Sequence, residues 1–301
     1  MATKRTHVEL GIVQMRCEQD TQRNLQKALA MTSEAARNGA QIVCLPELFR
    51  SQYFCQTEDA AMFDLAESTS GPSCVAFTEL AAKLDITVII SIFERRTAGL
   101  YHNAAIVIDG KQGAMGLYRK MHIPDDPRYY EKFYFTPGDL GFKAFQTRHC
   151  YIGTLVCWDQ WYPEAARITA LMGAQLLCFP TAIGWHPHER AALGDSQHDA
   201  WEVMQRSHAI ANGCFVAAIN RTGFEADPSA HGKDAEGIEF WGQSFVAAPD
   251  GRILCKAPAD EEAVLNVSLD LAMIEQQRRG WPFLRDRRID AYAGIEQRFI
   301  D

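Results

Sequence analysis

The stretch IGTLVCWDQWYPE, from Ile152 to Glu164, decides which class of fold the chain can adopt. Its first residues are apolar or small and predict a buried strand from Tyr151 to Val156, whereas Pro163 is typical of the first turn of a helix. Cys157 lies between them, where the apolar run changes to Trp-Asp-Gln-Trp. A buried strand that leads directly into a helix is the repeating unit of α/β folds, so the stretch predicts that class.

The same alternation of apolar strands and helices extends along the rest of the chain. Further strands are predicted at Glu9 to Gln14, Ile42 to Leu45, Ile86 to Phe93, Ala104 to Ile108, Ala114 to Arg119, Leu176 to Phe179, Cys214 to Asn220, Phe240 to Ala247 and Ala263 to Leu269. Helices are predicted from Asp20 to Gly39, from Gly71-Pro72 through Leu84, from Pro163 onward and from Asp195 to Asn212. Met121 to Gly141 is a predicted loop. Asp109-Gly110 and Asp250-Gly251 are hairpin signals, so the sheets are expected to be mixed.

Size and composition favour one domain over residues 1–301. The chain is 47% apolar and has a formal net charge of -8. An acidic protein repels phosphate backbones, so nucleic acid is not an expected partner. Since no apolar run is long enough to span a bilayer, no membrane segment is expected either. The segment 281–301 lacks a core pattern, and we expect this C-terminal tail to pack on a partner subunit.

The nine cysteines are scattered singly, without a CxxC pair. This spacing argues against a secreted disulfide framework and against a thiolate zinc site. The residues from Met1 to Thr6 are mostly polar and form no apolar leader. The expected compartment is therefore the cytoplasm.

Cys157 is a candidate nucleophile because of its place between strand and helix. A residue at such a sharp bend projects its side chain, and the N–H groups that follow face the same space. Those groups and the helix dipole favour a thiolate and an oxyanion. A buried, inert core cysteine is the alternative, but the abrupt change to polar and aromatic residues after Cys157 argues against it.

Two further reactive residues follow predicted strands. Glu47, in CLPELF, lies at the end of an apolar strand, where loss of solvent would make its carboxylate a better base. Lys120, in YRKMH, ends another strand and could stabilise an oxyanion. A surface turn and a solvated Arg-Lys pair are the alternative interpretations of these two segments. Together with Cys157, the two residues supply the nucleophile, base and cation that an activated nucleophile needs.

The order PELF, YRK and CWDQWYPE resembles the nitrilase superfamily of carbon–nitrogen hydrolases, and the resemblance includes HAIANGCFVAAINRTG (208–223) and WGQSFVAAPDG (241–251). MHIPDDPRYYEKFYFTPGD (121–139), CWDQWYPEAAR and FLRDRRIDAY (283–292) are similar to its N-carbamoylputrescine amidohydrolase branch. This resemblance implies a four-layer α-β-β-α sandwich whose subunits pair through the outer helices, hence a homo-oligomer. It also implies a triad of Glu47, Lys120 and Cys157, with Glu131 as a second glutamate and no metal or cofactor.

The same branch implies a small cationic carbamoyl substrate, whose free ammonium needs a carboxylate or an aromatic face. The candidate acids are Asp125, Asp126 and Asp159, and the candidate aromatic walls are Tyr53, Tyr130 and Trp158. Each acid could instead cap a loop. The alternative substrate, an N-carbamoyl acid such as N-carbamoyl-β-alanine, would need a cation, and Arg128 is a possible clamp.

Other interpretations of these segments are weaker. His186 and His188 could suggest a metal site, but no cysteine or acid completes a recognisable set, so a polar loop at the pocket rim is favoured. His122 could replace Glu47 as the base. Asn103 is expected to satisfy backbone groups rather than to contact substrate. A nitrilase-like module that binds without catalysis would lack a triad residue, and all three are present.

Overall fold

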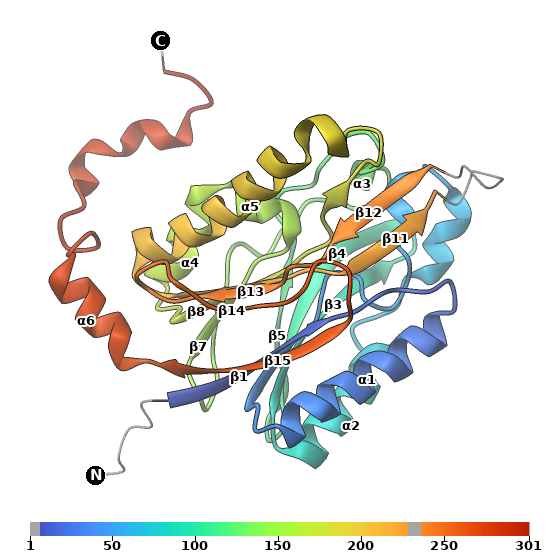
Figure 1. Cartoon of the computed structure of the whole chain (residues 1–301), viewed down its shortest axis with the longest axis horizontal. Coiled ribbons are helices and arrows are strands. Elements are labelled where there is room, and N and C mark those ends of the chain that lie inside the picture. The colour runs from blue at the N-terminus through green and yellow to red at the C-terminus, as the bar shows by residue number, and fades with distance from the viewer. Residues whose placement is uncertain (1–6, 228–235, 301) are drawn as a thin grey trace.

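Two six-stranded sheets lie face to face between two pairs of helices in the computed structural model, which describes residues 7–227 and 236–300 (Figure 1). The first sheet has the spatial order β15 (Ala263–Asp270), β1 (His7–Gln14), β2 (Ile42–Cys44), β3 (Thr87–Thr97), β4 (Leu100–Asp109) and β5 (Gly113–Arg119). The second has the order β14 (Ile253–Lys256), β13 (Phe245–Ala247), β10 (Phe215–Ile219), β8 (Leu176–Pro180), β7 (Tyr151–Thr154) and β6 (Ala144–Gln146). A small third sheet contains β11 (Thr222–Ala226), β12 (Gly237–Trp241) and β9 (Gly184–Trp185).

Both large sheets are mixed, as predicted. Strands β1, β2 and β3 are parallel to one another, as are β7, β8 and β10, and antiparallel strands flank each set. Apolar side chains from the two sheets, such as Leu10 and Ile89 from the first and Leu176 and Phe215 from the second, belong to one buried cluster. The interior of the molecule is therefore a sheet-on-sheet core.

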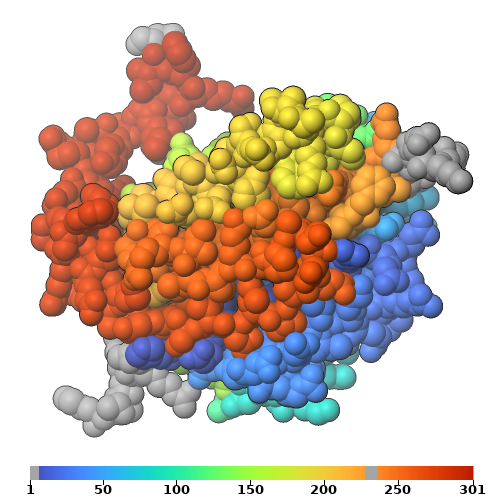
Figure 2. All heavy atoms as spheres, in the orientation of Figure 1, coloured from blue at the N-terminus to red at the C-terminus, as the bar shows by residue number. Residues whose placement is uncertain are grey.

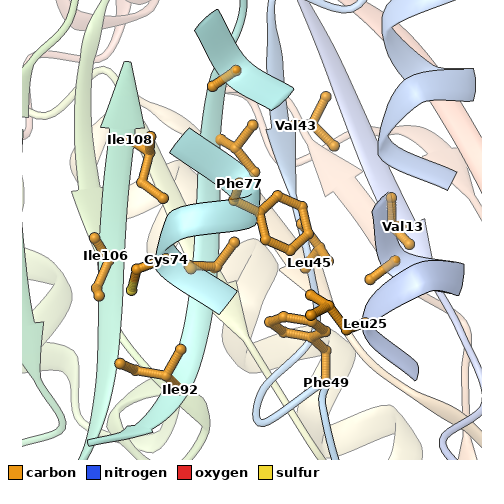
Figure 3. Close-up of a cluster of buried hydrophobic side chains, with 14 of the residues drawn as sticks. Val13, Leu25, Val43, Leu45, Phe49, Cys74, Phe77, Ile92, Ile106 and Ile108 are labelled. Atoms are coloured by element: carbon orange, nitrogen blue, oxygen red, sulfur yellow. The ribbon is translucent and has the colours of Figure 1, made fainter. Parts of the chain in front are cut away.

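Helices cover the outer face of each sheet and complete four layers. α1 (Thr21–Arg37) and α2 (Pro72–Leu84) pack on the first sheet through a cluster that includes Leu25, Phe49 and Phe77 (Figure 3). α4 (Pro163–Leu171) and α5 (Arg190–Asn212) cover the second. Asp20 caps α1 by accepting from the N–H groups of Gln22 and Arg23, as its residue type predicts. The predicted four-layer sandwich is confirmed.

Two predictions about elements are wrong. The run from Phe240 to Ala247 is not one strand but the end of β12 and all of β13, in different sheets. Gly242 (φ 57°) and Gln243 (φ 52°) adopt left-handed backbone between them and redirect the chain. The predicted loop from Met121 to Gly141 contains a helical turn, α3 (Glu131–Tyr134). The remaining elements are η1 (Phe54–Gln56), η2 (Ala60–Leu65), η3 (Cys157–Trp161), α6 (Ala272–Gly280), η4 (Ile289–Ala291) and η5 (Ala293–Glu296).

The chain leaves the sandwich after α6 and extends away from it (Figures 1 and 2). The part of this C-terminal tail that the structure describes, 281–300, exposes large apolar side chains such as Ile289 (74%), Ile295 (64%) and Phe299 (79%).

All nine cysteines are free thiols. Among the described residues, no helix is both long and apolar enough to cross a membrane.

Candidate active site

The three predicted triad residues follow strands of both large sheets. Glu47 comes after β2 and Lys120 directly after β5 in the first sheet, whereas Cys157 follows β7 in the second. All three side chains are buried: Glu47 and Lys120 have no exposed surface, and Cys157 is 5% exposed. The site therefore straddles the junction of the two sheets, where a shift of one sheet against the other would separate Glu47 from Cys157.

Cys157 occupies a strained bend. Its φ of 43° lies in the left-handed region, which is costly for a residue with a side chain and occurs at functional sites. The bend starts η3, so the N–H of Trp158 falls in a first helical turn, where N–H groups lack intrahelical acceptors. Sγ lies 3.8 Å from the carbonyl oxygen of Ala182. Burial raises the pKa of the Cys157 thiol well above its usual range, and Glu47 adds to this effect. Cys157 therefore rests as a thiol, and it would need a base to act as a nucleophile.

Lys120 bridges two buried carboxylates. Its Nζ donates to Glu47 Oε1 at 2.9 Å and to Glu131 Oε2 at 2.7 Å. Burial by itself would lower the pKa of Lys120, but the charges of Glu131 and Glu47 outweigh it and raise that pKa well above its usual range. The side chain is thus an ammonium with three N–H donors, two of which the carboxylates use. The third is available to an oxyanion.

The two oxygens of Glu47 have different surroundings. Oε1 accepts from Lys120 and also from Asn103 Nδ2, at 2.6 Å. Oε2 is buried and has no hydrogen-bond donor among the described residues. Asn103 was expected to satisfy backbone groups rather than to contact substrate. Its side chain instead holds the Glu47 carboxylate, while its carbonyl oxygen accepts from the N–H of Lys120 at 2.8 Å. Oε2 is left as the oxygen that can take a proton.

Glu131 holds the other side of Lys120. Its second oxygen accepts from the Tyr53 hydroxyl at 2.6 Å. Burial, together with the charge of Glu47, raises the pKa of Glu131 to about 7, although Lys120 opposes the shift. Tyr53 has no exposed surface and does not line the cavity, so its predicted role as a substrate wall is replaced by this bond to Glu131.

A cavity of about 260 Å³ opens beside Cys157. Two of its lining residues were predicted to bind substrate, Asp126 and Trp158. Tyr129 and Glu189 also line it and were missed. Glu189 is the N-cap of α5, 32 positions after Cys157, and no local pattern in the sequence marks it. The cavity therefore combines a thiol, aromatic surfaces and two carboxylates.

The other predicted substrate residues lie elsewhere. Asp125 and Tyr130 are not part of the cavity lining. Asp159 is fully buried, and its oxygens accept from Val156 N, Tyr118 Oη, His122 N and His122 Nδ1, at 2.7 to 3.0 Å. The prediction that Asp159 binds the substrate is wrong, because its carboxylate is occupied in fastening the Cys157 bend to the segment after Lys120.

The geometry does not favour Arg128 as a substrate clamp, His122 as a base, or His186 and His188 as metal ligands. Arg128 pairs with Asp227 Oδ2 at 2.5 Å and with Glu236, so its guanidinium is already neutralised. The His122 ring stacks on Tyr162, and its Nδ1 bonds to Asp159. These contacts hold the ring in a structural role and do not favour it as the base. His186 lines the cavity and its ring lies 5.8 Å from that of His188. Within the described residues, no group of three or more His, Cys, Asp or Glu side chains is arranged to hold a metal ion.

Comparison with known proteins gives consistent matches over almost the whole chain. The model of the carbon-nitrogen hydrolase family matches residues 9–279. An N-carbamoylputrescine amidase from Solanum tuberosum is 42% identical over 97% of this chain and 96% of its own. A citrullinase from Francisella tularensis is 37% identical over 97% of this chain and 99% of its own. The crystal structure of a carbon-nitrogen hydrolase from Helicobacter pylori G27 is 44% identical, with a TM-score of 0.93 over 98% of this chain and all of that one.

Proposed function

The chain belongs to the carbon-nitrogen hydrolase family, and from this premise we propose that it hydrolyses N-carbamoylputrescine to putrescine, ammonia and carbon dioxide. It is an enzyme that acts on carbon–nitrogen bonds other than peptide bonds. Cys157, Glu47 and Lys120 perform the chemistry. Glu131 keeps Lys120 in place. The reaction needs water as its only co-substrate.

In the first half-reaction, Glu47 Oε2 takes the proton of the Cys157 thiol as Sγ attacks the carbamoyl carbon. The carbonyl oxygen becomes an oxyanion and accepts from the third N–H of Lys120 and from the N–H of Trp158. When the tetrahedral intermediate collapses, Glu47 returns its proton to the departing nitrogen. One carbon–nitrogen bond breaks, and the carbamoyl carbon stays bound to Sγ.

In the second half-reaction, Glu47 takes a proton from a water molecule that attacks the same carbon. The same two donors stabilise the second oxyanion, and its collapse expels Sγ, which recovers the proton from Glu47. The released carbamic acid loses carbon dioxide to leave the second amine. Atoms balance, because one substrate and one water give one diamine, one ammonia and one carbon dioxide.

The choice of substrate depends on one feature, the charge of the cavity lining. Asp126 and Glu189 both line the cavity, so the lining favours a substrate with an ammonium group. Tyr129 and Trp158 add aromatic surface, which also attracts cations. The nearby cation, Arg128, is paired with two carboxylates and leaves no free guanidinium for a substrate carboxylate. These contacts support N-carbamoylputrescine over citrulline and over N-carbamoyl-β-alanine.

An ammonia-release assay over these three substrates tests the proposal. We expect kcat/KM to be highest for N-carbamoylputrescine, and we expect Cys157→Ala to abolish turnover of all three. Glu189→Gln should raise KM for N-carbamoylputrescine about tenfold with little change in kcat, since loss of the ammonium's partner weakens binding of the ground state and the transition state equally. Faster hydrolysis of either acid, or a Glu189→Gln variant with unchanged KM, would contradict this assignment.

We also propose that the chain works in the cytoplasm as a homo-oligomer in which the C-terminal tail packs on a partner subunit. The family match ends at residue 279, before the tail begins. The large apolar side chains that the tail exposes would be costly in water and favour burial against another chain.

A further inference from the structure

The guanidinium of Arg221 lies fully buried beneath the turn that carries Glu47. Arg221 follows β10 of the second sheet, whereas Glu47 follows β2 of the first. Its Nη2 donates to the carbonyl oxygens of Glu47 at 2.6 Å and Leu48 at 3.1 Å, and its Nη1 donates to that of Ser51 at 3.2 Å. One side chain thus holds three carbonyl groups of a five-residue turn on the opposite sheet.

The turn needs such an anchor because its backbone is strained. Leu48, directly after Glu47, has a φ of 48°, which a residue with a branched side chain rarely adopts. Strain of this kind persists only where surrounding contacts outweigh it. Leu48 and Glu47 are the residues whose carbonyl groups Nη2 holds. The anchor therefore acts at the point where the backbone would otherwise relax.

Glu225 keeps the guanidinium in place and extends the anchor to a second segment of the site. It is buried and its Oε1 accepts from Arg221 Nη1 at 2.9 Å. Its Oε2 accepts from the backbone N–H of Tyr53 at 2.6 Å. Tyr53 in turn bonds to Glu131, which holds Lys120. The pair Arg221 and Glu225 thus contacts both the turn from Glu47 to Ser51 and the following segment at Tyr53, which leads to Glu131 and Lys120.

We propose that Arg221 is a positioning residue for catalysis, which sets the Glu47 carboxylate against the Cys157 thiol by tying the turn of one sheet to the other. The proposal rests on Glu47 being the base in the proposed function. Arg221 follows the same sheet that supplies Cys157, so its bonds to the Glu47 turn fix the distance between the two sheets at the site. Loss of the Arg221 contacts is therefore expected to slow the proton transfer from Cys157 to Glu47 and to leave substrate binding nearly unchanged.

The variant Arg221→Lys tests this role. An ammonium keeps the charge but lacks the planar fork that reaches three carbonyls and a carboxylate at once. We expect kcat to fall at least about tenfold with KM changed less than about threefold, because a small displacement of a catalytic group is costly while the cavity is untouched. The rate of Cys157 alkylation by iodoacetamide should fall by a similar factor. Glu225→Gln, which keeps the shape of the pair, should lower both rates in the same direction by a smaller factor.

Two further variants, Arg148→Lys and Glu47→Gln, show whether a defect in Arg221→Lys comes from the position of Glu47. Arg148→Lys is the matched control, because Arg148 pairs with Asp85 and Asp109 at the opposite end of the sheet, and it should leave both rates unchanged. Glu47→Gln should slow alkylation as well, and if it does not, the role of Glu47 in the proposed function fails. If Glu47→Gln slows alkylation while Arg221→Lys keeps wild-type kcat and alkylation, the positioning role is overturned. Should Arg221→Lys not fold, unchanged rates in Glu225→Gln overturn it instead.

Discussion

At the scale of single residues, the chemistry that the site can perform depends on which oxygens and N–H groups are already hydrogen-bonded within the protein. Glu47 Oε1 accepts from two donors while Oε2 has no donor within the described residues. Lys120 uses two of its three N–H groups on carboxylates. Among the described residues, Glu47 Oε2 and the third N–H of Lys120 are therefore uncommitted, and they can serve as a proton acceptor for the thiol and a donor for the oxyanion.

Asn103 provides a direct test of this arrangement. Asn103→Leu removes a 2.6 Å bond to the Glu47 carboxylate, so we expect kcat to fall about tenfold, within the range for loss of a hydrogen bond to a charged group. Asn103→Asp should be more damaging, since it places a second carboxylate beside Glu47. Steady-state kinetics of the two variants decide the point. An aspartate variant as active as the wild type would contradict the description of Oε1.

Glu131 should leave a signature in the pH dependence of stability. Its pKa of about 7 exceeds its ordinary value of 4.5, so the folded state binds this proton more tightly than the unfolded state does. Its contribution to stability is greatest below pH 4.5 and is lost as pH rises to about 7. We expect the melting temperature of the wild type to fall more between pH 5 and about pH 8 than that of Glu131→Gln, which cannot ionise. Parallel curves for the two proteins would show that Glu131 does not titrate in this range.

The three residues proposed to react have a local signal in the sequence, whereas the residues that hold them in place do not. Glu47, Lys120 and Cys157 each follow an apolar strand, a pattern visible within a few residues. Asn103 and Arg221 reach the site only through pairing of strands and stacking of sheets. Asp159 shows the reverse error: its place beside Cys157 suggested a substrate contact, but its carboxylate is occupied by the chain itself.

At the scale of elements, the boundary between β12 and β13 shows that a run of apolar residues does not by itself reveal where a strand ends. The run from Phe240 to Ala247 is almost continuously apolar or small and predicts one strand, yet two left-handed residues divide it between two sheets. By contrast, helix ends were well predicted where a local signal exists. Asp20 caps α1, and Gly213 closes α5 with a φ of 54°.

The turn between β12 and β13 can be tested by substituting its glycine. A Cβ at Gly242 would lie 2.6 Å from the carbonyl oxygen of Ala259, in addition to the strain of its positive φ. Gly99 also has a positive φ but has open space around it. We expect Gly99→Ala to lower the free energy of unfolding by about 1 kcal/mol and Gly242→Ala by about 3 kcal/mol or more. Chemical denaturation measures both, and equal losses would argue against the close contact at Gly242.

At the scale of the whole molecule, the active site exists only because two sheets are stacked in register. Glu47 and Lys120, the proposed base and cation, follow strands of one sheet, and Cys157, the proposed nucleophile, follows a strand of the other. The resemblance to the nitrilase superfamily predicted this sandwich, while the strand count alone only permitted it. Glu189 could not be foreseen, because α5 brings it to the cavity from a distant part of the chain.

The tail offers a test of the proposed assembly. Ile289 and Ile295 are 74% and 64% exposed, so replacing both by Glu should leave the fold of the subunit intact. If the tail packs on a partner, the buried charges will weaken that contact and lower the mass found by light scattering after size exclusion. The exposed pair Glu275→Arg and Arg279→Glu, which lies on α6 outside the tail and exchanges both charges without changing their sum, serves as the control. A wild-type monomer, or a double-Glu variant of unchanged oligomeric mass, would contradict the proposed role of the tail.

Mass spectrometry of the enzyme quenched during turnover of N-carbamoylputrescine tests most directly whether Cys157 attacks the carbamoyl carbon. We expect the peptide containing Cys157 to gain the acyl group of the substrate, and the size of this group shows whether ammonia or putrescine leaves first. Glu47→Gln should accumulate less adduct, since the thiol then lacks its base. An adduct on another residue, or full turnover by Cys157→Ala, would show that Cys157 is not the nucleophile.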